Sequence, residues 1–323
     1  MVAPDAAAVA AATDSCLFLH FFRTKAIKHR AGISNWDPRA YMRNMIPFWK
    51  VIPGGNPTLL LLAQDVPPEK HAVTANALMS ATSVYAEQAG FVDFEQQSIT
   101  MMGGEFCVNA VRAFAVLLAE KNILPSTGRD YCSGIIKCSG MEQPVEVQVQ
   151  KLPNGIFFSR ACLRFADLPA FRSLRDGSML TRIPGITHII EAGSIPQNAE
   201  SFCAEQRRQN GLVGEEAVGH LWLSPCRAAQ DGRYECSLFP IIWVRETSTL
   251  CQETACGSGS LAAALYLRKM HGCNMFRIMQ PSGYALDVSF EQDAGSFKAW
   301  IGGPAWTATQ GVAALPKDAS APF

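Results

Sequence analysis

The sequence lacks the spacings that mark most metal sites and the charge that marks nucleic-acid-binding proteins. None of its 11 cysteines is spaced as CxxC, and its 6 histidines include neither an HExxH motif nor a close pair. Metal-binding chains usually show such spacings. The 28 Lys and Arg residues balance 28 Asp and Glu residues, so nothing favours a nucleic acid or an anionic membrane as partner. We expect no metal, no nucleic acid and no membrane.

Two further absences concern cofactors and targeting. No lysine motif typical of pyridoxal binding is evident, so we expect no cofactor. The apolar stretch at residues 17–22 is too short to span a bilayer and lacks a convincing cleavage site after it. An odd number of cysteines scattered through a largely apolar chain is typical of reduced thiols. These features together predict a cytoplasmic protein.

The length and the apolar content predict two domains. The chain has 323 residues, and 48% of them are hydrophobic, which is enough for two cores. Residues 1–44 differ from the pattern that follows, and we interpret them as an extension outside the folded core. We expect an N-terminal lobe at 45–168, a C-terminal lobe at 169–304, and a last strand and tail at 305–323.

Two short stretches carry the chemistry, one in each predicted lobe. Residues 103–112 contain Cys107 and residues 253–260 contain Cys256, each with a glutamate shortly before the cysteine and an apolar helical run after it. The runs predict helices at 110–119 and 261–270. Each cysteine would then lie at a helix start, where unpaired N–H groups and the helix dipole favour a thiolate and can also hold a carboxylate.

Two separate thiols are suited to proton exchange at a carbon. One thiolate removes a proton from one face, the opposite thiol supplies a proton to the other face, and the configuration inverts. Without a pyridoxal cofactor, N–H groups must stabilise the enolate-like charge on the substrate carboxylate. We predict Cys107 and Cys256 as the acid/base pair. The predicted substrate-binding residues are Asn56, Glu87, Asn109, Glu253, Gly257, Ser258 and Gly259.

The remaining pattern predicts an α+β fold in which strands and helices recur in similar order. Apolar or alternating runs predict strands, and two polar or amphipathic stretches predict further helices. The strands are expected at 45–51, 58–63, 131–137, 145–149, 155–165, 187–192, 221–224, 239–244, 275–279, 284–290 and 297–302. The additional helices are expected at 69–85 and 199–210. The turn at 53–57 and the acid Glu87 each have a plain loop interpretation beside a role at the ligand.

The two cysteine stretches resemble motifs of the cofactor-independent racemases and epimerases with the diaminopimelate epimerase fold. Residues 107–112 are similar to the family's Cys-Gly-Asn-Gly-x-Arg, and residues 255–259 to its Ala-Cys-Gly-Thr-Gly. Asn56 matches an early Gly-Asn. The resemblance covers about residues 45–310. It implies two pseudo-symmetric lobes, each a curved sheet around a central helix, and catalysis by Cys107 and Cys256.

Within that fold, the chain most resembles the histidine racemases of opine-type (staphylopine-type) metallophore biosynthesis. The shared stretches are 53–56, 78–82, 87–91, 105–107 and 280–283. The Glu-Arg-Gly stretch that diaminopimelate epimerases carry before their second cysteine is absent, and Val108 replaces a family glycine. The resemblance implies an isomerase that converts L-histidine to D-histidine without a cofactor. It also implies an active-site position for Glu87.

Other functions stay open from the sequence. Diaminopimelate epimerase, or another racemase of the same fold, is the first alternative. A phenazine-biosynthesis-like isomerase is the second, although such proteins lack the two cysteines. A non-catalytic amino-acid-binding protein is the third. The expected partner is a small amino-acid substrate, and the protein is expected to be a monomer or a homodimer.

Overall fold

The structure is a computed structural model that describes residues 45–246, 248–293 and 295–315. Most of its elements are short strands, in which the residues are either all apolar or alternately apolar and polar. The extension expected at 1–44 and the end of the tail, residues 316–323, lie outside the described residues. Within the described part, no helix is both long and apolar enough to cross a membrane. The described residues belong to one compact unit.

The helices and strands have the following bounds. The α-helices are α3 (His71–Met79), α4 (Val108–Glu120), α5 (Ala199–Gln209) and α6 (Gly257–His271), and the 3-10 turns are η1 (Ala63–Asp65), η2 (Pro68–Lys70) and η3 (Pro153–Gly155). The strands are β1 (Met45–Val51), β2 (Thr58–Leu62), β3 (Gln88–Asp93), β4 (Ser98–Met101), β5 (Ser126–Gly128), β6 (Tyr131–Cys138), β7 (Val145–Lys151), β8 (Phe157–Phe165), β9 (Phe171–Ser173), β10 (Met179–Ile183), β11 (Ile186–Ala192), β12 (Ala217–Leu223), β13 (Arg227–Ala228), β14 (Tyr234–Val244), β15 (Thr249–Gln252), β16 (Met275–Met279), β17 (Ala285–Asp293), β18 (Ser296–Ala305) and β19 (Thr307–Ala314).

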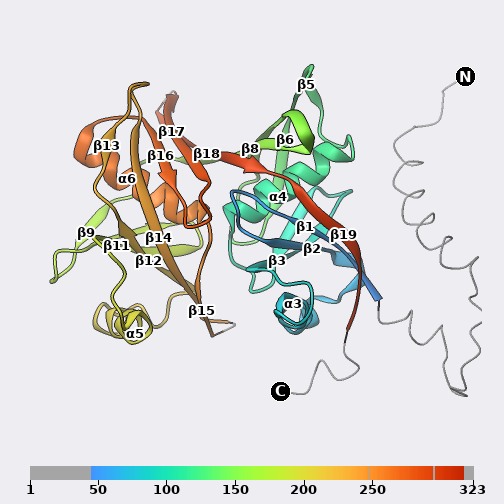
Figure 1. Cartoon of the computed structure of the whole chain (residues 1–323), viewed down its shortest axis with the longest axis horizontal. Helices are drawn as coiled ribbons and strands as arrows, with labels where there is room; N and C mark the ends of the chain where they lie inside the picture. The colour runs from blue at the N-terminus through green and yellow to red at the C-terminus, as the bar shows by residue number, and fades with distance from the viewer. Residues whose placement is uncertain (1–44, 247, 294, 316–323) are drawn as a thin grey trace, which may run out of the picture. The chain divides into compact units, whose positions relative to one another are not determined.

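The strands fall into two groups, one around α4 and the other around α6 (Figure 1). In the first group, β2 pairs with β1 antiparallel and with β3 parallel, and β3 pairs with β4 antiparallel. A parallel contact between β4 and β6 leads to the antiparallel strands β6, β7 and β8. Side chains from both sets of strands cover α4, so this helix is buried on almost all sides and is apolar apart from Asn109, Arg112 and the terminal Glu120.

The second group uses the same kinds of pairing. Strand β11 pairs with β10 antiparallel and with β12 parallel, and β12 pairs with β14 antiparallel. A parallel contact between β14 and β16 leads to the antiparallel strands β16, β17 and β18. Helix α6 packs against these strands and ends at His271. The next residue, Gly272, has a φ of 70° and gives the left-handed cap that glycine favours.

Long strands join the two groups. Strand β18 pairs antiparallel with the whole length of β8, from Phe297 opposite Phe165 to Ala305 opposite Phe157. The chain then continues into β19, which pairs antiparallel with β1. The largest apolar cluster includes residues of α4, α6 and the strands around both helices. One apolar core therefore supports both cysteine stretches.

The sequence predicted most elements, and its errors have local causes. The expected strands at 45–51 and 275–279 are confirmed with their bounds. The helix expected to reach residue 85 ends at Met79, because the Ser80 hydroxyl bonds the Thr82 N–H and hydroxyl and Tyr85 has a φ of 57°. Serine and threonine hydroxyls often compete with helix bonds in this way. Strands β4, β5, β9, β10, β13 and β15 were not predicted, and all six have five residues or fewer.

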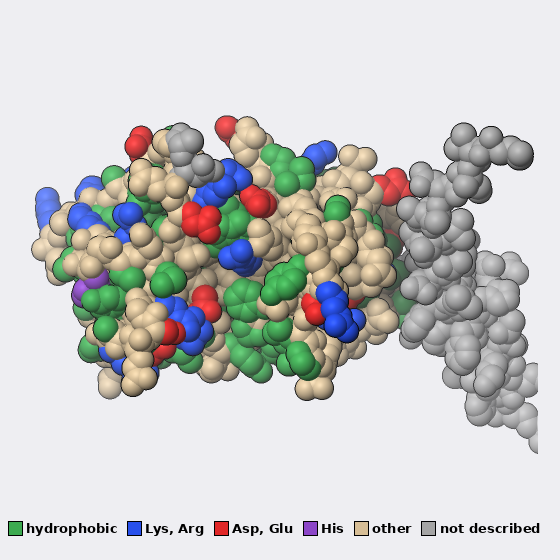
Figure 2. Space-filling model, turned by 90° about the horizontal axis from the view of Figure 1, so that it is seen from above, with side chains coloured by type: hydrophobic (Ala, Val, Ile, Leu, Met, Phe, Trp, Pro, Cys, Tyr) green, Lys and Arg blue, Asp and Glu red, His purple; other side chains and the backbone are tan. Residues whose placement is uncertain are grey.

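Charges of both signs are mixed on the molecular surface that Figure 2 shows. Lys and Arg side chains lie among Asp and Glu side chains and hydrophobic side chains, without a large region of one sign. This distribution agrees with the equal numbers of acidic and basic residues in the sequence.

Candidate active site

Cys107 caps the start of α4 and is half-buried. Its backbone is extended (φ −133°, ψ 113°), and its sulfur accepts a hydrogen bond from the Ala110 N–H at 3.5 Å. The thiol donates to Gln88 Oε1 at 2.8 Å. The sequence places a cysteine where serine or asparagine normally caps a helix, so the sulfur faces the first free N–H groups of α4.

Cys256 caps the start of α6 in nearly the same conformation (φ −124°, ψ 109°). Its sulfur accepts from the Gly259 N–H at 3.3 Å and lies 3.4 Å from the Ser258 hydroxyl oxygen. The residue is 3% exposed, and its backbone N–H donates to Gln280 Oε1 at 2.9 Å. Both predicted catalytic cysteines therefore lie at helix starts.

The two helix starts are in direct contact. A Cβ atom added to Gly257 would lie 2.9 Å from Val108 Cβ and 3.0 Å from Asn109 Oδ1, so only glycine fits here without movement. The Asn109 amide donates to the Ala255 carbonyl at 2.8 Å. Residues 146 positions apart in the sequence thus connect the two cysteine stretches.

The buried Arg112 fixes Asn109 from the other side. Its guanidinium donates to Asn109 Oδ1 at 3.2 Å, to the Ser159 carbonyl at 2.9 Å and to the Pro304 carbonyl at 3.4 Å. Burial lowers the pKa of Arg112 to about 9, against the opposing influence of Cys107. Both ends of the Asn109 amide are thereby bonded to protein groups. The direct contact of this side chain with substrate stays a prediction.

Glu253 is close enough to both thiols for its charge to act on each of them. After burial, the negative charge of Glu253 is the next influence that raises the pKa of Cys256, and it also raises the pKa of Cys107. Burial raises the pKa of Glu253 to about 8, and the charges of Glu87 and Glu105 add to the effect. The two sulfurs therefore share one acidic neighbour.

The thiols are held in their neutral form, contrary to the prediction that the helix starts bring their pKa toward neutrality. Burial raises the pKa of Cys107 to about 12 and raises that of Cys256 as well, and the negative charge of Glu253 contributes in both cases. The N–H groups of Ala110 and Gly259 act in the opposite direction but are outweighed. Desolvation and nearby carboxylates dominate the helix dipole here.

Asn56 and Glu87 belong to a network that reaches the second cysteine stretch. Asn56 is fully buried, and its Nδ2 donates to the Glu87 carboxylate at 2.6 Å. Glu87 also accepts from the Thr254 N–H at 3.0 Å. Burial raises the pKa of Glu87, although these two donors lower it. The structure thus places Glu87 beside the residue that follows Glu253.

The turn at 53–57 is held against the second cysteine stretch by close backbone contacts. Gly55 has a φ of 93°, and a Cβ atom added to it would lie 2.2 Å from Ser282 Cβ. The Thr254 hydroxyl donates to the Gly55 carbonyl at 2.8 Å, and the Ser282 hydroxyl donates to the Gly54 carbonyl at 2.7 Å. Glycine is needed here both for its conformation and for its size.

Two buried glutamines were not predicted as site residues. Gln88 contacts the Cys107 sulfur, and Gln280 contacts the Cys256 backbone. Each is a polar side chain next to mostly apolar residues, and Gln88 is 8% and Gln280 5% exposed. The sequence signals were that contrast and the position of both residues in stretches, 87–91 and 280–283, that resemble histidine racemases.

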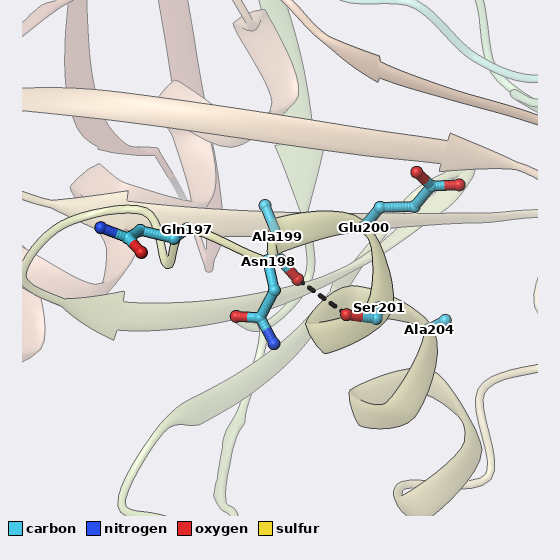
Figure 3. Close-up of a pocket in the computed structure, with 6 residues that line it drawn as sticks. All are labelled: Gln197, Asn198, Ala199, Glu200, Ser201 and Ala204. Carbon is cyan, nitrogen blue, oxygen red and sulfur yellow. Dashed lines mark hydrogen bonds between the residues drawn. The ribbon is translucent and has the colours of Figure 1, made fainter.

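A separate surface hollow of about 490 Å³ lies at the start of α5 (Figure 3). It contains none of the predicted site residues, and is lined by Gln197, Asn198, Ala199, Glu200, Ser201 and Ala204. Inside it, the Ser201 hydroxyl donates to the Asn198 carbonyl at 3.1 Å.

Comparison with known proteins identifies relatives over most of the chain. Residues 45–301 match the family model described as the histidine racemase CntK N-terminal domain. A curated histidine racemase from Fusobacterium nucleatum is 30% identical over 270 residues, which cover 80% of this chain and 93% of that protein. Another from Staphylococcus aureus is 26% identical over 289 residues, which cover 84% of this chain and 98% of that protein.

A solved structure shares the fold. A hydroxyproline epimerase from Agrobacterium vitis, crystallised with trans-4-OH-L-proline, superposes with a TM-score of 0.57 at 12% identity, covering 85% of this chain and 94% of that one. The likeness confirms a mixed, sheet-dominated α+β fold. Because the family model spans far more than half of the sequence, the chain belongs to the histidine racemase family.

Proposed function

We propose that this protein is an isomerase that inverts the α-carbon of histidine, converting L-histidine to D-histidine and back, with Cys107 and Cys256 as the two acid/base groups. The contact between the two helix starts, with Glu253 acting on both thiols, is the observation that carries this proposal. Membership of the histidine racemase family supports the choice of substrate.

The reaction needs one thiolate and one thiol on opposite faces of the substrate. The thiolate takes the α-proton as the C–H bond breaks, and the electron pair spreads onto the substrate carboxylate. The opposite thiol then gives its proton to the α-carbon, so the two sulfurs have exchanged roles at the end. The first N–H groups of α4 and α6 stabilise the carboxylate charge, because charge stabilisation is strong where water is excluded.

The acidic groups give the site a preference for a positively charged substrate. Burial raises the pKa of Glu253 to about 8, and a bound ammonium or imidazolium group would favour its charged form, so that Glu253 and Glu87 attract such a cation. Such a cation also offsets the carboxylate charge that raises the pKa of both thiols. Substrate binding then favours the thiolate that starts the reaction. The start of α6, at Gly257, Ser258 and Gly259, is the proposed carboxylate-binding segment, and Asn56 and Asn109 hold neighbouring groups in position.

The two groups of strands are proposed to be pseudo-symmetric lobes with the diaminopimelate epimerase-like fold, at 45–168 and 169–304. Their parallel and antiparallel pairings occur in the same order, and each contains one cysteine-capped helix. The last strand, β19, returns to the first lobe by pairing with β1. A cytoplasmic role in metallophore biosynthesis, as a monomer or homodimer, completes the proposal.

The proposal is tested by incubating the purified full chain with L-histidine in D2O. Chiral chromatography should detect D-histidine, and mass spectrometry should find deuterium at its α-carbon. The other common L-amino acids and diaminopimelate serve as comparison substrates. If the protein binds histidine without deuterium incorporation, it is a binding protein and the proposal fails. Faster inversion of another substrate would overturn the choice of histidine.

A further inference from the structure

A continuous chain of hydrogen bonds leads from Glu87 to the sulfur of Cys107. Asn56 Nδ2 donates to Glu87 at 2.6 Å, Gln88 Nε2 donates to Asn56 Oδ1 at 2.6 Å, and the Cys107 thiol donates to Gln88 Oε1 at 2.8 Å. Thr58 supports the middle of the chain, since its hydroxyl accepts from Gln88 Nε2 at 2.7 Å and donates to Asn56 Oδ1 at 3.1 Å. Strand pairing sets this arrangement, because β2 and β3 place Thr58 opposite Gln88.

The direction of every bond in this chain follows from its first member. A carboxylate only accepts hydrogen bonds, so Asn56 must turn its amino group toward Glu87. The carbonyl oxygen of Asn56 then faces Gln88, which must turn its own amino group toward Asn56. The remaining oxygen of Gln88 faces the sulfur. Cys107 can complete the chain only as a donor, which means as a thiol.

The surroundings of Cys256 are of a different kind. Its sulfur receives the Gly259 N–H and lies beside the Ser258 hydroxyl, and both groups can donate to a thiolate. The negative charge of Glu253 favours the thiol form of Cys256, as it does that of Cys107. The amide oxygen of Gln280 accepts from the backbone N–H of Cys256, whereas the amide oxygen of Gln88 accepts from the Cys107 sulfur.

We propose that Gln88, oriented by Asn56 and Glu87, is a positioning residue that holds Cys107 as a thiol in the free enzyme and so favours Cys107 as the acid of the first proton transfer. The inference rests on the proposed two-thiol racemase function. Other charges near Cys107 are the carboxylates of Glu253 and Glu105 and the guanidinium of Arg112. The two carboxylates favour the same thiol form, and Arg112 opposes them.

A preference of the free enzyme for one protonation form of its two thiols affects the KM and kcat values of the two enantiomers. Each enantiomer of a substrate binds productively to only one of the two protonation forms of a two-base racemase. The equilibrium constant for racemisation is one, so kcat/KM must be equal in both directions. A biased resting form therefore appears as unequal KM values for the two enantiomers, matched by equally unequal kcat values.

The first test measures the alkylation rate of Cys107 by iodoacetamide, followed by peptide mass spectrometry, at fixed pH and without substrate. Gln88→Met removes the amide oxygen but keeps an unbranched side chain. We expect Cys107 to react roughly threefold to tenfold faster, because the neutral thiol loses a hydrogen bond worth about one pKa unit while the nucleophilicity of the thiolate falls slightly. Gln280→Met is the matched control, and it should leave the Cys107 rate unchanged.

Glu87→Met tests whether Glu87 sets the direction of these hydrogen bonds. Glutamine would not serve, because the Thr254 N–H and Asn56 Nδ2 donate to the same Glu87 oxygen and would hold the amide oxygen of a glutamine there. Methionine removes that acceptor, so Asn56 and Gln88 can turn and Gln88 can donate to the sulfur. Cys107 should again be alkylated several-fold faster. In the Gln88→Met background, the same Glu87→Met change should add little, since the connecting amide is gone. Equal effects of Glu87→Met in both backgrounds would overturn the inference, and so would an unchanged Cys107 rate in Gln88→Met.

The second test compares the KM values of the two enantiomers of histidine. Gln88→Met should shift their ratio by up to roughly tenfold, toward tighter binding of the enantiomer that needs Cys107 as the thiolate, whereas a merely structural defect would change kcat and leave the ratio unaltered. An unaltered ratio in an active variant would overturn the inference. Alkylation needs no turnover, so it gives a result even if histidine is not the substrate. Failure of the proposed function and failure of this inference are thereby distinguishable.

Discussion

The starts of α4 and α6 share one backbone design but surround their cysteines with different groups. Both cysteines cap a helix in nearly the same extended conformation, and each sulfur accepts the N–H three residues later. Two positions after the cysteine, Asn109 reaches across to Ala255, whereas Ser258 turns back to the Cys256 sulfur. Repetition of the backbone therefore does not imply equivalence of the thiols.

The difference shows how two helix starts with the same backbone conformation can surround their thiols differently. Proton exchange requires one thiol and one thiolate at the same moment, although both sulfurs lie in similar geometry. The amide oxygen of Gln88 favours the thiol at Cys107, whereas the Ser258 hydroxyl lowers the pKa of Cys256 and Glu253 raises it. Gln88, outside the two cysteine stretches, and Ser258, inside the second one, thus give the two sulfurs different neighbours.

Removing either sulfur is expected to have the largest effect. Cys107→Ser or Cys256→Ser should lower kcat for racemisation at least about a thousandfold, because a hydroxyl is a far weaker acid than a thiol and general acid/base catalysis contributes about 10²–10⁴-fold. Chiral chromatography with L-histidine and with D-histidine provides the measurement. The comparison with Cys132→Ser, a half-buried cysteine on β6, controls for loss of a thiol as such.

Substantial turnover in both single variants would refute the pairing of the two sulfurs. Each variant should also be checked by circular dichroism, since its fold is expected to stay intact. If only one variant loses activity, the site uses one thiol and a different second group, and the two helix starts do not supply the acid/base pair together.

The contact between the helix starts can be broken at Gly257. In Gly257→Ala, the added methyl group meets Val108 Cβ at 2.9 Å and Asn109 Oδ1 at 3.0 Å. Overpacking of this kind costs about 1–3 kcal/mol of unfolding free energy, which urea denaturation can measure. We also expect a large loss of racemisation, because the two cysteines move apart.

Two further variants sharpen this prediction. Gly214→Ala adds a methyl group where no atom lies within 4 Å, so its stability should change by less than about 0.5 kcal/mol. Val108→Gly in the Gly257→Ala background removes the clashing side chain and should recover part of both stability and activity. A stable, fully active Gly257→Ala variant would mean that the spacing of the helix starts does not matter.

The helix starts could be predicted from sequence because their signals are local. A cysteine before an apolar run of helical length, with Gly272 at the end of the second run, defines the elements that carry Cys107 and Cys256. Gln88 could not be predicted in the same way. Its role depends on the parallel pairing of β2 and β3, which places Thr58 opposite it, and on Asn56, 32 positions away.

The pKa directions of the two thiols could not be predicted from local sequence either. The helix dipole is visible in the sequence, and it led to the wrong direction for the pKa of both thiols. The opposing influences are burial, which the fold creates, and the charge of Glu253, which reaches Cys107 only after the two halves have packed together. Glu105 contributes to the pKa of Glu253 in the same manner.

Glu253→Gln should change the pH dependence of stability. The pKa of Glu253 is raised from 4.5 to about 8, so its protonated form favours the folded state. The stability that it contributes is complete below pH 4.5 and is lost as the pH rises toward 8. Glutamine imitates the protonated carboxyl at every pH. We therefore expect the variant to gain stability relative to the native protein between these values, and to keep that gain at pH 9.

Thermal unfolding at pH 4, 6, 8 and 9 measures this effect. Glu95→Gln, on the exposed turn between β3 and β4, is a matched control in which the difference should stay constant across the series. A Glu253→Gln variant whose stability relative to the native protein is the same at every pH would show that Glu253 is not held protonated by its surroundings. Glu253 could then not be regarded as an acidic group that acts on both helix starts.

The smallest effect is expected from Ser258→Ala. The Ser258 hydroxyl lies 3.4 Å from the Cys256 sulfur and lowers the pKa of that thiol, so its loss should slow alkylation of Cys256 and reduce kcat by roughly twofold to fivefold. Alkylation of Cys107, which has Asn109 at the corresponding position, should be unchanged. Peptide mass spectrometry reports both rates in one sample. Equal slowing at both cysteines would mean that the two helix starts respond as one unit, and that Ser258 does not distinguish them.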